Sequence, residues 1–168
     1  MLEIKNLTVK VKNDAPILTD VSLSIDEGTC IGLTGASGSG KTTLIKSIMG
    51  MNGGDLEVPQ GQILLDGDNL LTHSAKERRM LCGKTIGFIP QNPMTAFFPH
   101  AKMERQIIET LRMHTGTDKK QARELAENVL RKVNLTDTKR VLRAYPGELS
   151  GGMLQRIAMA LILGTKPK

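Results

Sequence analysis

The chain has 168 residues, of which 39% are hydrophobic and 24% are charged, and its formal net charge is +6. This balance is typical of a globular protein with its own core, and neither a membrane-spanning run nor a signal-peptide pattern is present. The basic residues are scattered, only 2% of residues are aromatic and tryptophan is absent, so a base-stacking surface and a nucleic-acid partner are not expected.

The first segments of the chain are predicted to be strands. Residues 2–11 alternate imperfectly between apolar and polar types, which predicts a strand that residues 13–16 interrupt. Residues 21–25 alternate again. Residues 30–34 form a short apolar run that predicts a buried strand, in which Cys30 would be a small core residue.

A glycine-rich loop follows directly. Residues 35–42, GASGSGKT, fit the spacing G-x-x-x-x-G-K-[ST] of a phosphate-binding loop. Its glycines let backbone N–H groups approach an anion, Lys41 would reach the β- and γ-phosphates, and Thr42 would hold Mg²⁺. Residues 43–49 predict a helix, whose positive end adds to the site. A plain turn is the alternative, which the strand–loop–helix context disfavours. The predicted nucleotide-binding residues are Gly35, Ser37, Gly38, Ser39, Gly40, Lys41, Thr42 and Thr43.

The next stretch predicts a mixture of short elements. Residues 52–54 should end the helix with a glycine cap. Residues 62–65 predict a strand closed by a tight turn at residues 66–67. Residues 75–81 predict a short helix, and residues 85–89 predict a second buried strand.

From residue 102 to about residue 142 the pattern becomes helical. Met103, Ile107 and Leu111 recur every four residues, which indicates an amphipathic helix facing a core. Residues 116–118 supply a stop and an N-cap for the helix that follows. An α/β front half therefore leads into a helical insert.

A second helix start comes near the end of the chain. Ser150 is a natural N-cap for an apolar helix over residues 153–163, and Gly151 and Gly152 would expose backbone N–H groups. This start lacks a lysine. On local chemistry alone, a capped helix with a flexible entry is favoured over an anion site.

No metal-binding cluster is expected from the histidines or cysteines. His73, His100 and His114 are isolated from one another, and Cys30 and Cys82 lack metal-like spacing. Surface positions are the favoured interpretation for the three histidines.

Three motifs in one order resemble the ATP-binding subunit of an ABC transporter. They are the loop at residues 35–42, Gln91 after a predicted strand, and LSGGMLQR at residues 149–156. QNPMTAFFP at residues 91–99 is similar to the Q-loop region of dipeptide, oligopeptide and nickel importers. The stretch at residues 140–148 is similar to the nickel-type members.

The resemblance implies an α/β fold of the P-loop NTPase class. It would have a parallel-sheet core, a small antiparallel β part and an α-helical subdomain. The implied divisions are a nucleotide-binding core at residues 1–90, a Q-loop and helical subdomain at 91–150, and a signature helix at 151–168.

The resemblance also implies roles and partners. Lys41 and Gln91 would be catalytic, Thr42 and Gln91 would serve Mg²⁺, and Ser150, Gly151 and Gly152 would contact ATP held by a second subunit. That subunit would pair head to tail, at the cytoplasmic face of the membrane, on transmembrane permease subunits fed by a solute-binding protein. The transported substrate would be a nickel or other metal complex, or a peptide.

Three departures from the family pattern matter. No aromatic residue precedes the loop to stack on adenine, and Ala36 and Gly147 stand where the subfamily commonly has Glu and His. After LSGG, the chain contains no Walker B strand with its carboxylates and no later His. We therefore expect a truncated subunit that does not hydrolyse ATP in this 168-residue form. The alternatives left open are a non-transport ABC ATPase acting on DNA or ribosomes, and a regulatory nucleotide-binding module.

Overall fold

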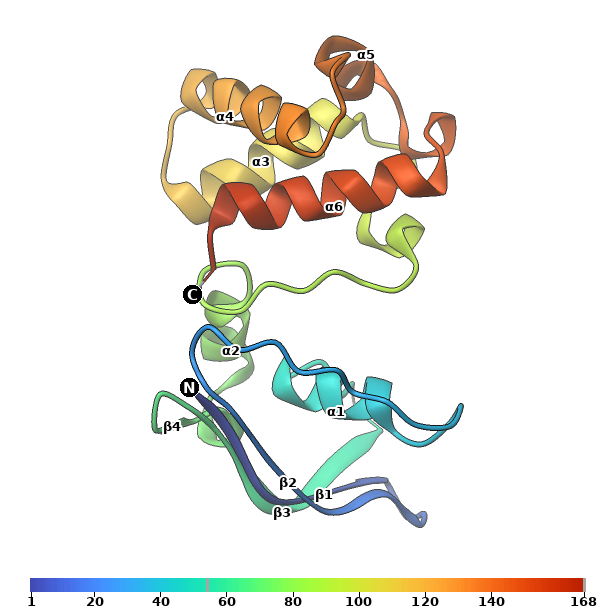
Figure 1. Cartoon of the computed structure of the whole chain (residues 1–168), viewed down its shortest axis with the longest axis vertical. Coiled ribbons are helices and arrows are strands. Elements are labelled where there is room, and N and C mark those ends of the chain that lie inside the picture. The colour runs from blue at the N-terminus through green and yellow to red at the C-terminus, as the bar shows by residue number, and fades with distance from the viewer. Residues whose placement is uncertain (54, 168) are drawn as a thin grey trace. The chain divides into compact units, whose positions relative to one another are not determined.

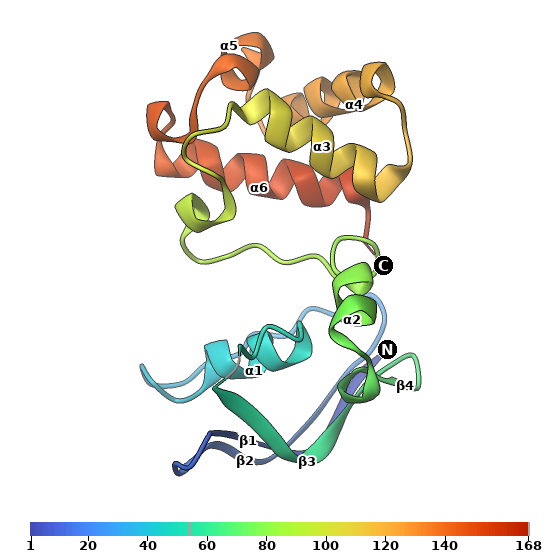
Figure 2. The same ribbon diagram turned by 180° about the vertical axis from the view of Figure 1, so that it is seen from behind.

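The computed structural model describes residues 1–53 and 55–167. They divide into two compact units, Met1–Met80 and Leu81–Lys168. Figures 1 and 2 show the sheet in the first unit and the helical layer in the second. The divisions expected at residues 90 and 150 stay predictions.

The first unit is built on a four-stranded antiparallel sheet. Its strands are β1 (Leu2–Val11), β2 (Pro16–Ile25), β3 (Leu56–Leu65) and β4 (Asp68–Asn69), in the order β2-β1-β3-β4. Leu2 pairs with Ile25 on one side and with Leu65 on the other. The predicted antiparallel β part is therefore present, and its core contains the buried side chains of Ile4, Leu7, Val9, Leu18, Leu44 and Ile63.

A bulge explains why β1 alternates imperfectly. Asn6 has a positive φ of 49°, and the pairing register of β1 shifts between Ile4 and Leu7. The extra residue returns Leu7 to the buried face, three positions after Ile4. Gly61 on β3 fits the same place, because a Cβ there would lie 2.5 Å from the Cα of Leu7.

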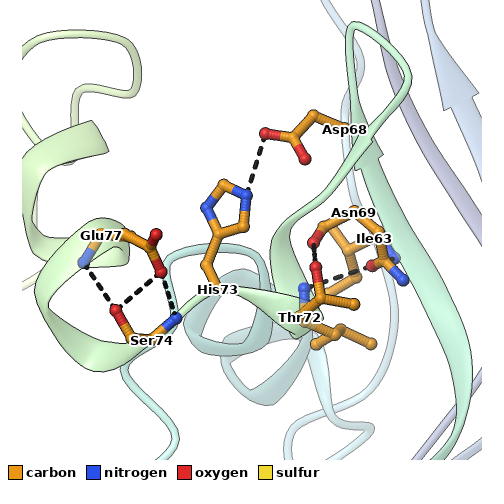
Figure 3. Close-up of polar contacts among 8 residues, drawn as sticks. Ile63, Asp68, Asn69, Thr72, His73, Ser74 and Glu77 are labelled. Carbon is orange, nitrogen blue, oxygen red and sulfur yellow. Dashed lines mark hydrogen bonds and ion pairs between the residues drawn. The ribbon is translucent and has the colours of Figure 1, made fainter.

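The link from β4 into α2 (Ala75–Leu81) is held by side chains, as Figure 3 shows. Asn69 begins the 3₁₀ turn Leu70–Thr72, and its Oδ1 accepts from the N–H groups of Leu71 and Ile63. Ser74 Oγ and Glu77 Oε2 then hydrogen-bond each other at 2.7 Å, and each accepts the other's backbone N–H. The predicted helix is confirmed with its predicted bounds.

Two predicted strands do not form. Residues 30–34 and 85–89 carry no strand assignment, and Ile31, Leu33, Phe88 and Ile89 are exposed rather than buried. Cys30, expected in the core, is exposed too. An extended segment becomes a strand only beside a hydrogen-bonding partner. In the described part of the chain, parallel pairing is limited to an isolated bridge between Cys82 and Ile86, so the expected parallel sheet is not formed by these residues.

The second unit is a helical layer around one core. Its helices are α3 (Met103–Thr115), α4 (Lys119–Lys132), α5 (Thr138–Arg143) and α6 (Gly151–Thr165), with 3₁₀ turns at Pro93–Ala96 and Pro146–Glu148. Helix α6 packs against both α3 and α4 (Figures 1 and 2). Met103, Ile107 and Leu111 are fully buried, which confirms the predicted apolar stripe.

Helix ends in this unit follow the sequence signals closely. Gly116 takes a left-handed conformation after α3, and Asp118 caps α4 in a capping box with Gln121. Both features were predicted from residues 116–118.

Candidate functional site

The predicted phosphate-binding loop lies at the start of α1 (Lys41–Ile48) in the first unit. Gly40 occupies the N-cap with φ 86°, a left-handed conformation that favours glycine. It is buried, and a Cβ there would lie 2.5 Å from Leu18 Cδ2. This glycine therefore fixes where α1 begins against β2. The helix ends at Ile48 with Gly50 at φ 66°, four residues before the predicted end. Of that predicted end, Gly54 lies outside the described residues.

Lys41 closes the loop from inside. Its Nζ donates to the carbonyl oxygens of Gly35 at 2.9 Å and Ala36 at 2.6 Å, and to Ser39 Oγ at 3.3 Å. These contacts place the ammonium group within the ring of backbone that the glycines form. A positive charge held there is suited to an anion entering the loop.

The backbone of the loop fits a phosphate cradle. A Cβ at Gly35 would lie 2.9 Å from Ser39 Oγ and 4.0 Å from Lys41 Nζ, so a side chain would occupy the space that an anion needs. A Cβ at Gly38, which has a φ of 80°, would meet nothing within 4 Å. No acidic side chain lies in the first turn of α1, which leaves the positive end of the helix unneutralised. The residues present therefore fit the triphosphate of a nucleotide.

The polar side chains predicted around this loop are accessible. Ser37, Ser39 and Thr42 are exposed, and Thr43 is half-buried. Thr42 lies one residue after Lys41 in the first turn of α1. In residues 1–53 and 55–167, no cluster of three or more His, Cys, Asp or Glu residues is arranged to hold a metal ion.

Gln91 is the first polar residue of the second unit's candidate site. It is exposed and directly precedes a capped 3₁₀ turn, in which Asn92 Oδ1 accepts from the Met94 N–H at 3.1 Å. The turn ends at Phe97, which is buried in the helical core. Phe97 therefore packs in the core of the helical unit. Met94 and Phe98 are exposed, at 45% and 77% of their surface.

Gln106 is a residue that the sequence patterns do not single out. Its side-chain amide accepts from the Phe98 N–H at 2.8 Å and donates to the Phe98 and Ala101 carbonyls at 3.0 and 2.7 Å. Three hydrogen bonds from one side chain fix the segment Phe98–Ala101 onto α3. A glutamine on a helix carries no local signal for a partner eight residues earlier.

The LSGG stretch begins α6 as predicted. Ser150 is the N-cap, with its Oγ accepting from the Met153 N–H at 3.3 Å, and Leu149 is buried in the helical core. Gly151 and Gly152 are exposed, and a Cβ at either would meet nothing within 4 Å. The first turn of α6 again lacks acidic side chains. The backbone at this helix start is thus accessible to an anionic partner.

The structure groups the predicted residues into two sets. Residues 35–43 belong to the first unit, and Gln91 with Ser150, Gly151 and Gly152 belongs to the second. The first set makes a loop closed by a lysine. In the second set, Ser150, Gly151 and Gly152 make a helix start without a lysine, and Gln91 belongs to a separate segment before the 3₁₀ turn Pro93–Ala96.

Comparison with known proteins agrees with these motifs. The family model described as ABC transporter matches residues 18–168, which include the phosphate loop, Gln91 and LSGG. The chain belongs to this family. Similarity to curated relatives extends over the whole chain. It is 37% identical over 169 residues to the metal-staphylopine import system ATP-binding protein CntD of Staphylococcus aureus. It is 34% identical over 172 residues to the dipeptide transport ATP-binding protein DppD of Lactococcus lactis.

These relatives are longer than the chain. The matched region covers all of this chain, but 62% of CntD and 49% of DppD.

Among solved structures, the ATP-binding cassette MJ0796 bound to ADP and Pi in a dimeric post-hydrolysis state superposes with a TM-score of 0.84 at 25% identity. The match covers 99% of this chain and 71% of that one. The predicted fold class, an ABC ATPase cassette with an antiparallel β part and a helical subdomain, is confirmed. In the part of the chain that the structure describes, no helix is long and apolar enough to cross a membrane.

Proposed function

We propose that this chain belongs to the ATP-binding subunit of an ABC importer, in which ATP binding and hydrolysis drive uptake. The observation that carries the proposal is the Lys41 ammonium held within the glycine loop at the start of α1. Support comes from two relatives whose names describe ATP-binding proteins of import or transport systems. Neither of these names refers to DNA or ribosomes, so the non-transport alternative is not favoured.

Each loop residue has a part in binding ATP. The backbone N–H groups of Gly38, Ser39 and Gly40 would bind phosphate oxygens, and Lys41 would exchange its carbonyl contacts for the β- and γ-phosphates. The Ser37, Thr42 and Thr43 side chains would bind at the same site. Lys41 thereby neutralises charge that develops on the transferred phosphoryl group, which is the main protein contribution to such reactions.

Mg²⁺ completes this site in the proposal. The Thr42 hydroxyl would be a ligand, and Gln91 would approach the same ion and help to place the attacking water. The ion supplies Lewis acidity to the phosphoryl oxygens.

The 168-residue chain itself is not expected to turn over ATP. No carboxylate-bearing strand follows LSGG in its sequence, so water would be poorly oriented. Phosphate release by the purified chain should not exceed that of Lys41→Ala. Turnover well above that variant would contradict the expectation.

We further propose that Ser150, Gly151 and Gly152 act on ATP held by a second subunit. The pair would be arranged head to tail. The glycine backbone is accessible and lacks its own lysine, so it suits a phosphate that is already bound elsewhere. A dimeric arrangement is described for the cassette MJ0796.

We propose a broad class of transported substrate and, within it, a specific one. Metal complexes and peptides are the cargoes named for CntD and DppD, and nickel is the finer proposal from the stretch at residues 140–148. Permease subunits would receive the chain at the cytoplasmic face of the membrane as a peripheral protein, and a solute-binding protein would deliver cargo to those subunits.

Cross-linking tests the importer assignment. Residues 91–102 should face a permease subunit, since exposed Met94 and Phe98 lie beside Gln91 in sequence. A cysteine replacing exposed Thr95 in the assembled transporter should cross-link to a membrane subunit, whereas one replacing exposed Lys132 on α4 should not. Absence of any cross-link from Thr95→Cys would contradict the docking surface.

A further inference from the structure

The first turn of α6 begins with two residues that have no side chain to anchor them. Gly151 and Gly152 are both exposed there. The apolar residues that hold this end of α6 in the helical core, Leu149 and Leu154, come before and after the pair. Glycine has more conformational freedom than any other residue, so a contact from outside the pair is what restricts its orientation.

Arg156 makes such a contact. Its Nε donates to the Gly152 carbonyl at 3.4 Å, and its Nη1 donates to the Asn134 carbonyl at 3.3 Å. Arg156 lies one turn after Gly152, and a long helical side chain points back toward the N-terminus of its own helix. The guanidinium group therefore joins the start of α6 to the end of α4.

Asn134 belongs to a well-defined helix end. It has a φ of 60°, and its N–H donates to the Arg131 carbonyl at 3.0 Å. The next N–H, that of Leu135, donates to the Leu130 carbonyl at 3.0 Å. These two bonds are those of a Schellman motif, and a cation at the C-terminal end of a helix is favourable. Arg156 thus ties the glycine pair to a fixed part of the backbone.

No acidic side chain competes for Arg156. It forms no ion pair with any residue in 1–53 or 55–167, and its side chain is half-buried. The planar guanidinium group offers N–H donors in several fixed directions, whereas a lysine has one compact ammonium group. An arginine can therefore bind both carbonyl oxygens at once.

We infer that Arg156 is a positioning residue, which holds the backbone of Gly151 and Gly152 in the orientation that meets ATP on the second subunit. It acts through the glycines and does not itself touch the nucleotide. The inference rests on the proposed function, in which these glycines act on ATP held by a second subunit, and adds the side chain that fixes them. Binding of ATP at the Lys41 loop, in the first unit, does not depend on Arg156.

The test uses the whole protein. Arg156→Gln removes the guanidinium group. Arg131→Gln is the matched control, because Arg131 lies near the same end of α4 but donates to Glu127 at 3.1 Å. The affinity of the monomer for Mg-ATP, dimerisation in the presence of ATP and hydrogen exchange at the start of α6 are measured for each variant. Thermal unfolding verifies the fold.

Arg156→Gln should weaken ATP-dependent dimerisation about tenfold, because hydrogen bonds from a charged group are lost, while the monomer keeps its affinity for Mg-ATP. The N–H groups of Met153 and Leu154, whose acceptors are both on Ser150, should exchange faster. The control should match the wild type in all three measurements. Faster exchange throughout the helical unit would show a general structural role and would overturn the inference.

Arg156→Lys separates the double contact from the charge. One ammonium group cannot replace donors to two carbonyl oxygens, so dimerisation of this variant should lie between that of Arg156→Gln and that of the wild type. Full recovery in Arg156→Lys would assign the effect to charge alone and would overturn the inference.

The inference and the proposed function can fail separately. If the wild type dimerises with ATP and Arg156→Gln dimerises equally well, the inference is wrong and the proposed function stands. If the wild type does not dimerise with ATP, both the inference and the proposed action of LSGG on a second subunit are wrong. Loss of Mg-ATP binding by the Arg156→Gln monomer would contradict the inference by placing Arg156 at its own chain's nucleotide site.

Discussion

The glycine-rich starts of α1 and α6 have similar sequences but differ in backbone conformation and in charge. At α1, glycine conformation is obligatory, because Gly40 is buried at φ 86° and Lys41 fills the loop. At α6, the glycines are exposed and unstrained, and Ser150 alone caps the helix. The start of α1 has the Lys41 ammonium group beside the place where a phosphate would bind. The start of α6 has only backbone N–H groups and the Ser150 hydroxyl. The two helix starts therefore differ in whether a lysine is present and in how tightly the backbone is constrained, and we propose that only the first is a full phosphate site.

The largest expected effect concerns the second start. Gly151→Asp in the whole protein should abolish ATP-dependent dimerisation and lower hydrolysis by more than about 100-fold, because its carboxylate would repel the γ-phosphate. An aspartate at this helix start favours the helix locally, so the fold should persist. ATP titration of the monomer and size-exclusion chromatography with ATP check this. Loss of ATP binding by the monomeric variant would show that LSGG serves its own chain's site.

A smaller effect is expected on the free energy of unfolding when a glycine at each helix start is replaced by alanine. Gly40→Ala should destabilise the protein by about 2–4 kcal/mol, from the left-handed conformation and the contact with Leu18. Gly152→Ala, in open space within the first turn of α6, should instead stabilise it by about 0.5 kcal/mol.

Urea denaturation of both variants provides the measurement. Equal effects at the two glycines would show that the loop is not constrained as described.

The sequence was most informative where signals are local. The capping residues Ser150 and Asp118 and the stripe through Met103, Ile107 and Leu111 were all identified correctly, since a helix satisfies its hydrogen bonds within itself. A strand needs a neighbouring strand for its backbone hydrogen bonds. The apolar runs at residues 30–34 and 85–89 contain no information about such a neighbour, so the strands predicted there were wrong.

The candidate site shows the same division. The Lys41 loop is recognisable from its spacing, because the Lys41 ammonium group contacts residues only two to six positions earlier in the chain. The hold of Gln106 on Phe98 could not be predicted, since it joins a helix to a preceding turn by side-chain amide geometry alone.

The smallest expected effect is a change of stability with pH at a third helix start, that of α2. There the Glu77 carboxylate of the chain itself is the anion. The Ser74 hydroxyl and N–H donate to Glu77 and lower the pKa of its carboxyl below the ordinary value. A lowered pKa means stability that is present above the unfolded-state pKa and lost as the pH falls through the folded one. Acidification below the ordinary range of a glutamate should therefore loosen α2.

An NMR titration of the Glu77 carboxyl checks this. In Ser74→Ala its pKa should return toward the ordinary value, because the hydroxyl no longer donates to it. An unchanged pKa in that variant would assign the shift to the backbone N–H alone.

The Lys41 loop should bind nucleotide unaided, whereas the LSGG helix start should not. Titration of the 168-residue chain with Mg-ATP tests it directly, comparing Lys41→Ala with Ser150→Ala. The first variant should lose ATP binding, since the loop loses its cation, while the second should retain the wild-type affinity despite losing about 1 kcal/mol of stability with its cap. Unchanged affinity in Lys41→Ala, or loss of binding in Ser150→Ala, would contradict the account.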